Sequence, residues 1–255
     1  MRARTIATAI ALLLLTGAQT EAAEIKALVS TAMKAPFDEI TAQFEKATGH
    51  KVVAAYGPTG GLARRIASGE TVDLVILGGD QTAELLKQGK LAAGSNTDIA
   101  RAMIGAGVAK GARKPDISSE AAFRAALLQA KSIAVTDAAG GGSSGIFLAK
   151  TFDRMGLTET LKPKSKFAAG GTEGYAGTFV AKGEAEFALQ PIPELLAVPG
   201  IEIVGPLPGA FRNVTTYRAS IPASAKEAEA AKALIKLLAA PSAAGIYKTK
   251  GFEPG

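Results

Sequence analysis

Short apolar runs typical of β-strands alternate with helix-like stretches along most of this chain. In the first part of the sequence, strand-like runs at 25–30, 51–56 and 72–77 alternate with helix-like stretches at 36–48, 61–68 and 81–88. In the stretch 36–48 the apolar residues recur at the helical period, and Gly49 follows as a helix cap. The run VDLVIL is apolar on both faces, as in a parallel strand covered on both sides. This alternation predicts an α/β fold, an open sheet whose strand ends face a ligand.

A second series of the same kind follows a loop around residue 112. Its expected elements are helix 119–129, strand 132–136, helix 144–154, strand 166–168, helix 174–181, strands 186–190, 201–205 and 214–219, helix 225–238 and a last short helix from Pro241. Two series with crossovers near residues 104 and 213 predict two lobes with a cleft between them, where small-molecule sites tend to form. We expect lobe 1 to hold residues 23–104 plus 213–255, and lobe 2 to hold residues 105–212.

The N-terminus has the pattern of a secretory signal peptide. Arg2 and Arg4 precede the apolar run 6–15, and small residues follow at 18–23. The run is too short to span a bilayer. We therefore predict a signal peptide at residues 1–22, cleaved after Ala22, and export to the periplasm.

Composition excludes several common kinds of active site. The chain has no cysteine and one histidine, His50, so Cys-based metal sites are excluded and Ser-His-Asp triads are strongly disfavoured. Its formal net charge of +6 is spread along the chain without a basic run, which predicts no nucleic-acid partner. A mild positive field favours an anionic ligand instead. We expect no metal, no cofactor and a monomer.

The loop TDAAGGGSSGIFLAK, residues 136–150, lies between an expected strand and an expected helix. Gly140 to Gly145 matches the dinucleotide pattern G-x-G-x-x-G, but it occurs far from the first strand of the fold. Ile146 stands where a phosphate-binding loop would have lysine. Backbone amides, serine hydroxyls and a helix N-terminus together bind negative charge without any cation. The loop is therefore interpreted as a site for a small free anion.

Three further loops are expected to line the same cleft. They are Ser30–Met33, Gly57–Gly61 and Gln190–Pro193. For any single loop, helix capping by Ser144 or Thr59 is the favoured explanation, but three such loops in corresponding positions favour a binding site. Glu173 could act as an acid or base and Tyr175 could touch the ligand, whereas Arg64 and Arg65 either reach the cleft or lie on a solvated face. His50 is expected at the surface.

Four stretches of this sequence resemble the molybdate-binding protein family, the periplasmic solute-binding components of ABC importers. They are FDEITAQFEKATGHKV, GPTGGLARRIASGETVDLVILGGD, the loop described above through FLAK, and VAKGEAEFALQ. The resemblance implies a two-lobed periplasmic-binding-protein fold of type II and a membrane permease as partner. It also implies a small anionic ligand held by hydroxyls and backbone amides.

Carried over residue by residue, the resemblance implies a set of ligand-binding positions. They are Ser30 or Thr31, Thr59 with Gly60, and Ser143, Ser144 and Gly145, with Gln190 where the family often has a capping tyrosine. The second loop has Pro58-Thr59 in place of the family's usual two serines. The anion is thus either a molybdate-like oxyanion or a small carboxylate.

The segment GEAEFALQPIPELLAVPGIEIVGPLP resembles a branch of the same superfamily that includes a periplasmic aconitate isomerase. This leaves two hypotheses open. The first, which the scarcity of catalytic side chains favours, is a receptor that delivers an anion to an importer. The second is an isomerase of a tricarboxylate, with Glu173 as its candidate base.

Overall fold

The computed structural model of the protein describes residues 22–170 and 174–255. Residues 1–21 of the predicted signal peptide, and Glu173, lie outside these ranges. Within them, no helix is both long enough and apolar enough to cross a membrane. Helices and strands alternate along the chain, which confirms the predicted α/β class.

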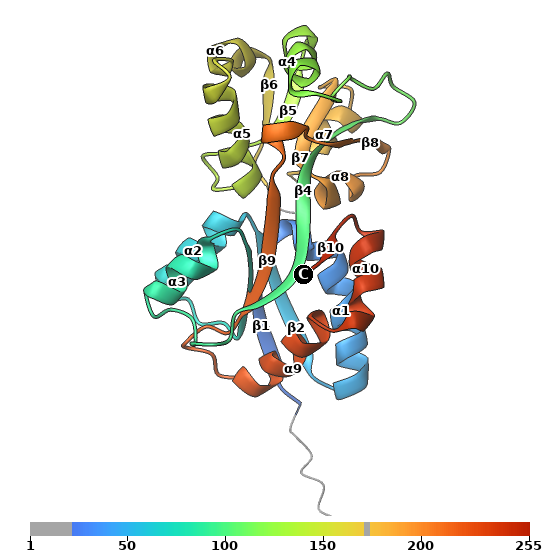
Figure 1. Ribbon diagram of the computed structural model, residues 1–255. Coiled ribbons are helices and arrows are strands. Elements are labelled where there is room, and N and C mark those ends of the chain that lie inside the picture. Colours follow the sequence, from blue (N-terminus) through green and yellow to red (C-terminus); the bar gives the residue numbers. More distant parts are fainter. Residues whose placement is uncertain (1–21, 171–173) are drawn as a thin grey trace, which may run out of the picture.

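Within the described ranges the sheet contains ten strands, and the connections between them carry the helices (Figure 1). The strands are β1 Glu24–Ser30, β2 Lys51–Gly57, β3 Leu74–Gly78, β4 Thr97–Ala109, β5 Ile133–Thr136, β6 Ser165–Ala168, β7 Phe187–Pro191, β8 Ile201–Pro206, β9 Val214–Ser220 and β10 Glu253–Pro254. The α-helices are α1 Lys34–Thr48, α2 Thr59–Ala67, α3 Gln81–Lys87, α4 Glu120–Gln129, α5 Ser143–Arg154, α6 Thr158–Leu161, α7 Ala176–Ala181, α8 Ile192–Leu196, α9 Ala228–Leu238 and α10 Ala244–Thr249. Short 3₁₀ helices are η1 Thr31–Met33, η2 Lys162–Lys164, η3 Gly209–Phe211 and η4 Pro241–Ala243.

Two strands, the long β4 and the shorter β9, connect the two halves of the molecule. The strand order is β2-β1-β3-β9-β4-β7-β5-β6, with β8 and β10 also paired to β4. β4 pairs with β9 up to Met103 and with β7 from Ile104 onward, so its partner changes within one continuous strand. In Figure 1, α4–α8 surround the upper end of this strand pair, and α1–α3, α9 and α10 surround the lower end. The predicted two-lobed architecture is thereby confirmed.

Parallel and antiparallel strand pairs lie in different parts of the sheet. The trios β2-β1-β3 and β7-β5-β6 are parallel, as predicted from the alternation of strands and helices. All antiparallel pairs among the described strands involve β4 or β9. Because the carboxyl ends of parallel strands meet at one edge of a sheet, the two trios present their loops to the region between the halves.

Each half has its own apolar core. In the lower half, α1 buries Phe37, Ile40 and Phe44 against β1 and β3, and Gly49 ends this helix in the left-handed conformation at φ 77°. The upper half is built around Phe123, Leu148 and Leu189. Burying one such side chain contributes about 1.5–3 kcal/mol. Because the cores are separate, a movement of one half relative to the other need not disrupt either core.

Several elements differ from the prediction for local reasons. α8 occupies a segment predicted as loop, since Pro191 and Pro193 resemble turn signals but proline is tolerated in the first turn of a helix. α9 begins at Ala228, because the preceding amides of Lys226 and Glu227 donate to the buried Asp73 carboxylate. The expectation that His50 is a surface residue is wrong: it is 9 % exposed and its Nδ1 accepts from the amide of Ala23.

Candidate functional site

The carboxyl ends of β1, β2 and β5 meet at a small cavity between the two halves. Its lining residues come from both halves and are Ser30, Thr31, Gly57, Pro58, Thr59, Thr136, Gly142, Ser143, Ser144, Gly170, Tyr175, Pro191, Glu194 and Tyr217. The cavity has a volume of about 20 Å³ and its described lining contains no lysine or arginine. Such a volume suits a compact group, and any negative charge there would be held by hydroxyls, backbone amides and helix termini.

The lower half contributes three serine and threonine hydroxyl groups to the cavity. Ser30 Oγ lies 2.9 Å from Thr59 Oγ1, which also accepts from the amide of Gly78. The Thr31 hydroxyl is buried and has no hydrogen-bond partner among the described residues. Leaving a buried hydroxyl unpaired costs about 1–3 kcal/mol, so Thr31 is a donor that a ligand oxygen would satisfy. α2 begins at Thr59 and directs its positive end to the same place.

The upper half contributes the glycine- and serine-rich loop. Thr136 ends β5, and Ser144 Oγ donates to its hydroxyl at 3.2 Å. Ser143, the first residue of α5, is half-buried and lines the cavity. Gly145 lets α5 approach β5 closely, because a Cβ there would lie 2.4 Å from the carbonyl oxygen of Thr136. The motif therefore places a helix N-terminus and two serines against the cavity.

The two halves touch directly at the rim of the cavity. The amide of Gly60 donates to the carbonyl of Gly141 at 3.1 Å. A Cβ at Gly60 would lie 2.8 Å from that oxygen, and one at Gly170 would lie 3.0 Å from Pro58. Only glycine permits contacts this close, so the structure shows the halves closed over the cavity.

Arg64 and Arg65, which are adjacent in α2, lie in different surroundings. The Arg64 guanidinium lies beside Gly141, 3.1 Å from where a Cβ of that glycine would be. Arg65 instead pairs with Glu70 on the surface, at 2.5 Å. Of the two arginines considered in the sequence, Arg64 reaches the edge of the contact between the halves.

A carboxylate that the sequence analysis did not select, Glu194 of α8, lines the cavity. Burial raises its pKa to about 7, and a hydrogen bond from Gln190 lowers it only in part. Gln190 is itself fully buried and oriented, because its Oε1 accepts from the amides of Ala176 and Gly177 at 2.9 and 3.4 Å. Its Nε2 is thereby directed to Glu194 and to Thr136. Near neutral pH, Glu194 can gain or lose a proton.

Two tyrosine hydroxyls complete the wall around Glu194. Burial raises the pKa of Tyr175 to about 12, with further contributions from Glu194 and Asp38. Burial and then Glu194 also raise the pKa of Tyr217 well above its usual range. Both groups stay protonated at physiological pH and remain hydrogen-bond donors.

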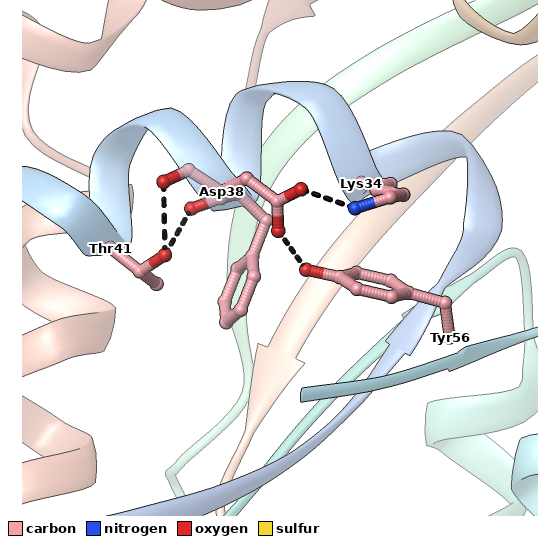
Figure 2. Close-up of polar contacts among 5 residues, drawn as sticks. Lys34, Asp38, Thr41 and Tyr56 are labelled. Carbon is pink, nitrogen blue, oxygen red and sulfur yellow. Dashed lines mark hydrogen bonds and ion pairs between the residues drawn. The ribbon is translucent and has the colours of Figure 1, made fainter. Parts of the chain in front are cut away.

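A polar cluster lies close in sequence to the residues of the lower wall, and its contacts are shown in Figure 2. The Asp38 carboxylate bonds to the Lys34 ammonium on one side and accepts from the Tyr56 hydroxyl on the other. The Lys34 nitrogen also lies 4.6 Å from the centre of the Tyr56 ring. Lys34 begins α1, three residues after Thr31, and Tyr56 is the next-to-last residue of β2, two residues before Pro58. The cluster thus ties together the two loops that carry the lower hydroxyls.

The structure brings together most of the residues selected from the sequence. Ser30, Thr31, Thr59, Ser143, Ser144 and Tyr175 line the cavity. Gly60 lies at the contact between the halves, Gly145 lies in the helix–strand packing, and Gln190 lies one layer behind the wall. Glu173 lies outside the described residues. Thr136, Glu194 and Tyr217 were missed; only Thr136, at a strand end before a glycine loop, had a local signal.

Comparison with known proteins gives a matching family, two relatives and a solved structure with a similar fold. Residues 25–253 match the family model described as bacterial extracellular solute-binding protein. An aconitate isomerase of Pseudomonas sp is 35 % identical over 222 residues, covering 85 % of this chain and 82 % of that protein. The molybdate-binding protein ModA of Azotobacter vinelandii is 31 % identical over 238 residues, covering 91 % and 90 %. The solved periplasmic molybdate-binding protein of Azotobacter vinelandii shares the fold, with a TM-score of 0.70, 21 % identity and coverage of 89 % and 98 %.

Proposed function

The chain belongs to the bacterial extracellular solute-binding protein family, and from that premise we propose that it is the periplasmic receptor of an ABC-type importer. In this proposal the mature protein acts as a monomer, captures a small anion between its lobes and delivers it to a membrane permease. Lobe 1 comprises residues 23–104 and 213–255, and lobe 2 comprises residues 105–212. The supporting observation is that hydroxyls from both halves surround one closed cavity whose described lining has no basic residue.

The binding mechanism follows from these neutral donors. Thr31, Ser143 and the amino ends of α2 and α5 each offer partial positive charge to an anion. A hydrogen bond to a charged group is worth about 1.5–3 kcal/mol, so a few such donors hold an ion without a counter-charge. Closure of the halves by hinge motion then excludes water and forms the contact between Gly60 and Gly141.

The volume of the cavity favours a compact oxyanion over an extended carboxylate. So small a cavity suits a single compact group, such as the molybdate of the ModA relative's name, better than a tricarboxylate. A thermal-shift screen of molybdate, tungstate, sulfate, phosphate and tricarboxylates tests the receptor. A ligand present at a hundred times its Kd stabilises the folded protein by about 2.7 kcal/mol, which raises the Tm by several degrees. A Tm that none of these compounds moves would contradict the proposal.

A second candidate function is the isomerisation of a tricarboxylate. It is favoured by the 35 % identity to an aconitate isomerase and by Glu194, whose pKa of about 7 suits a base that removes and returns a proton beside a carboxylate. Incubating the mature protein with cis-aconitate and following trans-aconitate by NMR tests it. Turnover that is lost in Glu194→Gln would support this candidate, and the absence of turnover in the wild type would remove it.

A further inference from the structure

Glu194 is a carboxyl group in a cavity whose other polar side chains are hydroxyls. Among the described residues it has no ion-pair partner, and the cavity wall offers it no lysine or arginine. We propose that the cavity takes its anion together with one proton, which is held between Glu194 and the ligand. This inference rests on the proposed anion-binding function and specifies the kind of anion that the site prefers.

The geometry leaves room for only one negative charge. A carboxylate that lines so small a cavity lies close to any anion bound in it, and the two charges repel strongly, so one of the two groups must be protonated. The titratable groups that face Glu194 are Tyr175 and Tyr217, both protonated and neither able to neutralise a second charge. The cation of the nearby cluster, Lys34, is engaged by Asp38.

One side of the Glu194 carboxyl group is already occupied. Gln190 donates to it, and the Gln190 amide cannot reverse because its oxygen accepts from two backbone amides. The remaining hydrogen-bonding capacity of Glu194 is directed to the cavity that it lines. A proton placed there bonds Glu194 to a ligand oxygen, whichever of the two carried it before binding.

The two sources of the proton give different pH dependences. Sulfate carries no proton between pH 6 and 9, so its binding must take one up on Glu194. Its affinity should then fall by up to roughly tenfold for each pH unit above the pKa of Glu194 in the free protein. Hydrogen phosphate brings its own proton and should be affected far less. At alkaline pH the protein should therefore prefer phosphate to sulfate.

Isothermal titration calorimetry with sodium sulfate and sodium phosphate, from pH 6 to 9, tests the proposal. In two buffers of different ionisation enthalpy, the wild type should take up close to one proton per sulfate at pH 8. Glu194→Gln should bind sulfate with an affinity that does not change with pH, and should exceed the wild type by roughly tenfold or more at pH 9. Glu229→Gln, which alters a carboxylate whose side chain is 86 % exposed, should match the wild type throughout.

The outcomes separate this inference from the function on which it rests. Sulfate binding with no proton uptake and no pH dependence would overturn the shared proton while supporting the anion receptor. Equal pH dependence in the wild type and Glu194→Gln would also overturn it. If neither protein binds either anion at any pH, the inference is overturned, and the thermal-shift screen with molybdate and tungstate decides separately whether the anion receptor falls with it. Because proton uptake is measured on the unmodified protein, the test does not depend on how well Glu194→Gln folds.

Discussion

Replacing Gly60 by alanine should weaken anion binding without weakening the fold. Gly60 is the second residue of α2, and alanine in a helix is more stable than glycine by up to about 1 kcal/mol. With the lobes apart, the new methyl group has no neighbour across the cleft, so the ligand-free protein should melt at the wild-type temperature or slightly above it. The effect of the substitution appears only on closure.

In the closed structure the new Cβ would lie 2.8 Å from the carbonyl oxygen of Gly141. That oxygen belongs to the backbone of a loop and cannot rotate away as a side chain would. Relieving the overlap costs about 1–3 kcal/mol, and separation of the halves also breaks the hydrogen bond from the Gly60 amide. A total of about 2 kcal/mol or more corresponds to a Kd raised roughly thirtyfold.

The assay is isothermal titration calorimetry with molybdate and sulfate, accompanied by the Tm of the ligand-free protein. Gly61→Ala is the matched control: it adds the same methyl group to the next position of α2, where the nearest atom is Arg64 Nη2 at 3.9 Å. It should bind as the wild type does. An unchanged Kd in Gly60→Ala, or an equal loss in both variants, would refute the view that direct contact of the lobes stabilises the bound state.

Two further predictions concern the cavity wall. Burial raises the pKa of Glu194 to about 7, above its ordinary value of 4.5, so the folded state loses stability as pH rises between these values. Glu194→Gln should therefore raise the free energy of unfolding by up to about 3 kcal/mol at pH 8 and by little at pH 5, as measured by urea denaturation; an equal gain at both pH values would contradict this. Thr31→Val and Thr82→Val each remove a buried hydroxyl that lacks a partner among the described residues, so both should leave the fold at least as stable. Only Thr31→Val, which alters the cavity, should raise the Kd for anions, by roughly tenfold or more in calorimetric titrations. An unchanged Kd in this variant would show that Thr31 does not donate to the ligand.

Much of the site could be predicted because its lower and upper hydroxyls lie either at the end of a strand or at the start of the helix that follows it. Ser30 and Ser143 are local features, since a strand, a turn and a helix start are each encoded within a few residues. Tyr217 could not be predicted in the same way: it reaches the cavity because β9 pairs with both β3 and β4, and such pairing is not visible in the sequence of one strand. Glu194 could not be selected from the sequence because Pro191 and Pro193, which precede it, favour a loop. In the structure these prolines lie at the start of α8 instead.

The fold likewise has some features that are encoded locally in the sequence and others that depend on long-range pairing. Alternation of strands and helices predicts parallel neighbours, and it is right for β2-β1-β3 and β7-β5-β6. The antiparallel course of β4 and β9 depends on which residues meet after the chain has folded. The bounds of individual elements shift for equally specific reasons, such as the three backbone amides that bind the carboxylate of Asp73.

The central claim is that neutral donors from both halves hold one anion, and removing one hydroxyl from each half tests it most directly. Calorimetric titration of molybdate and sulfate into the wild type, Ser30→Ala and Ser143→Ala would measure the contribution of each half. The wild type should bind at least one of these anions, and each substitution should raise that Kd by roughly tenfold or more, because each removes a hydrogen bond to a charged group. Binding that survives both substitutions unchanged, or a wild type that binds neither anion, would contradict the account.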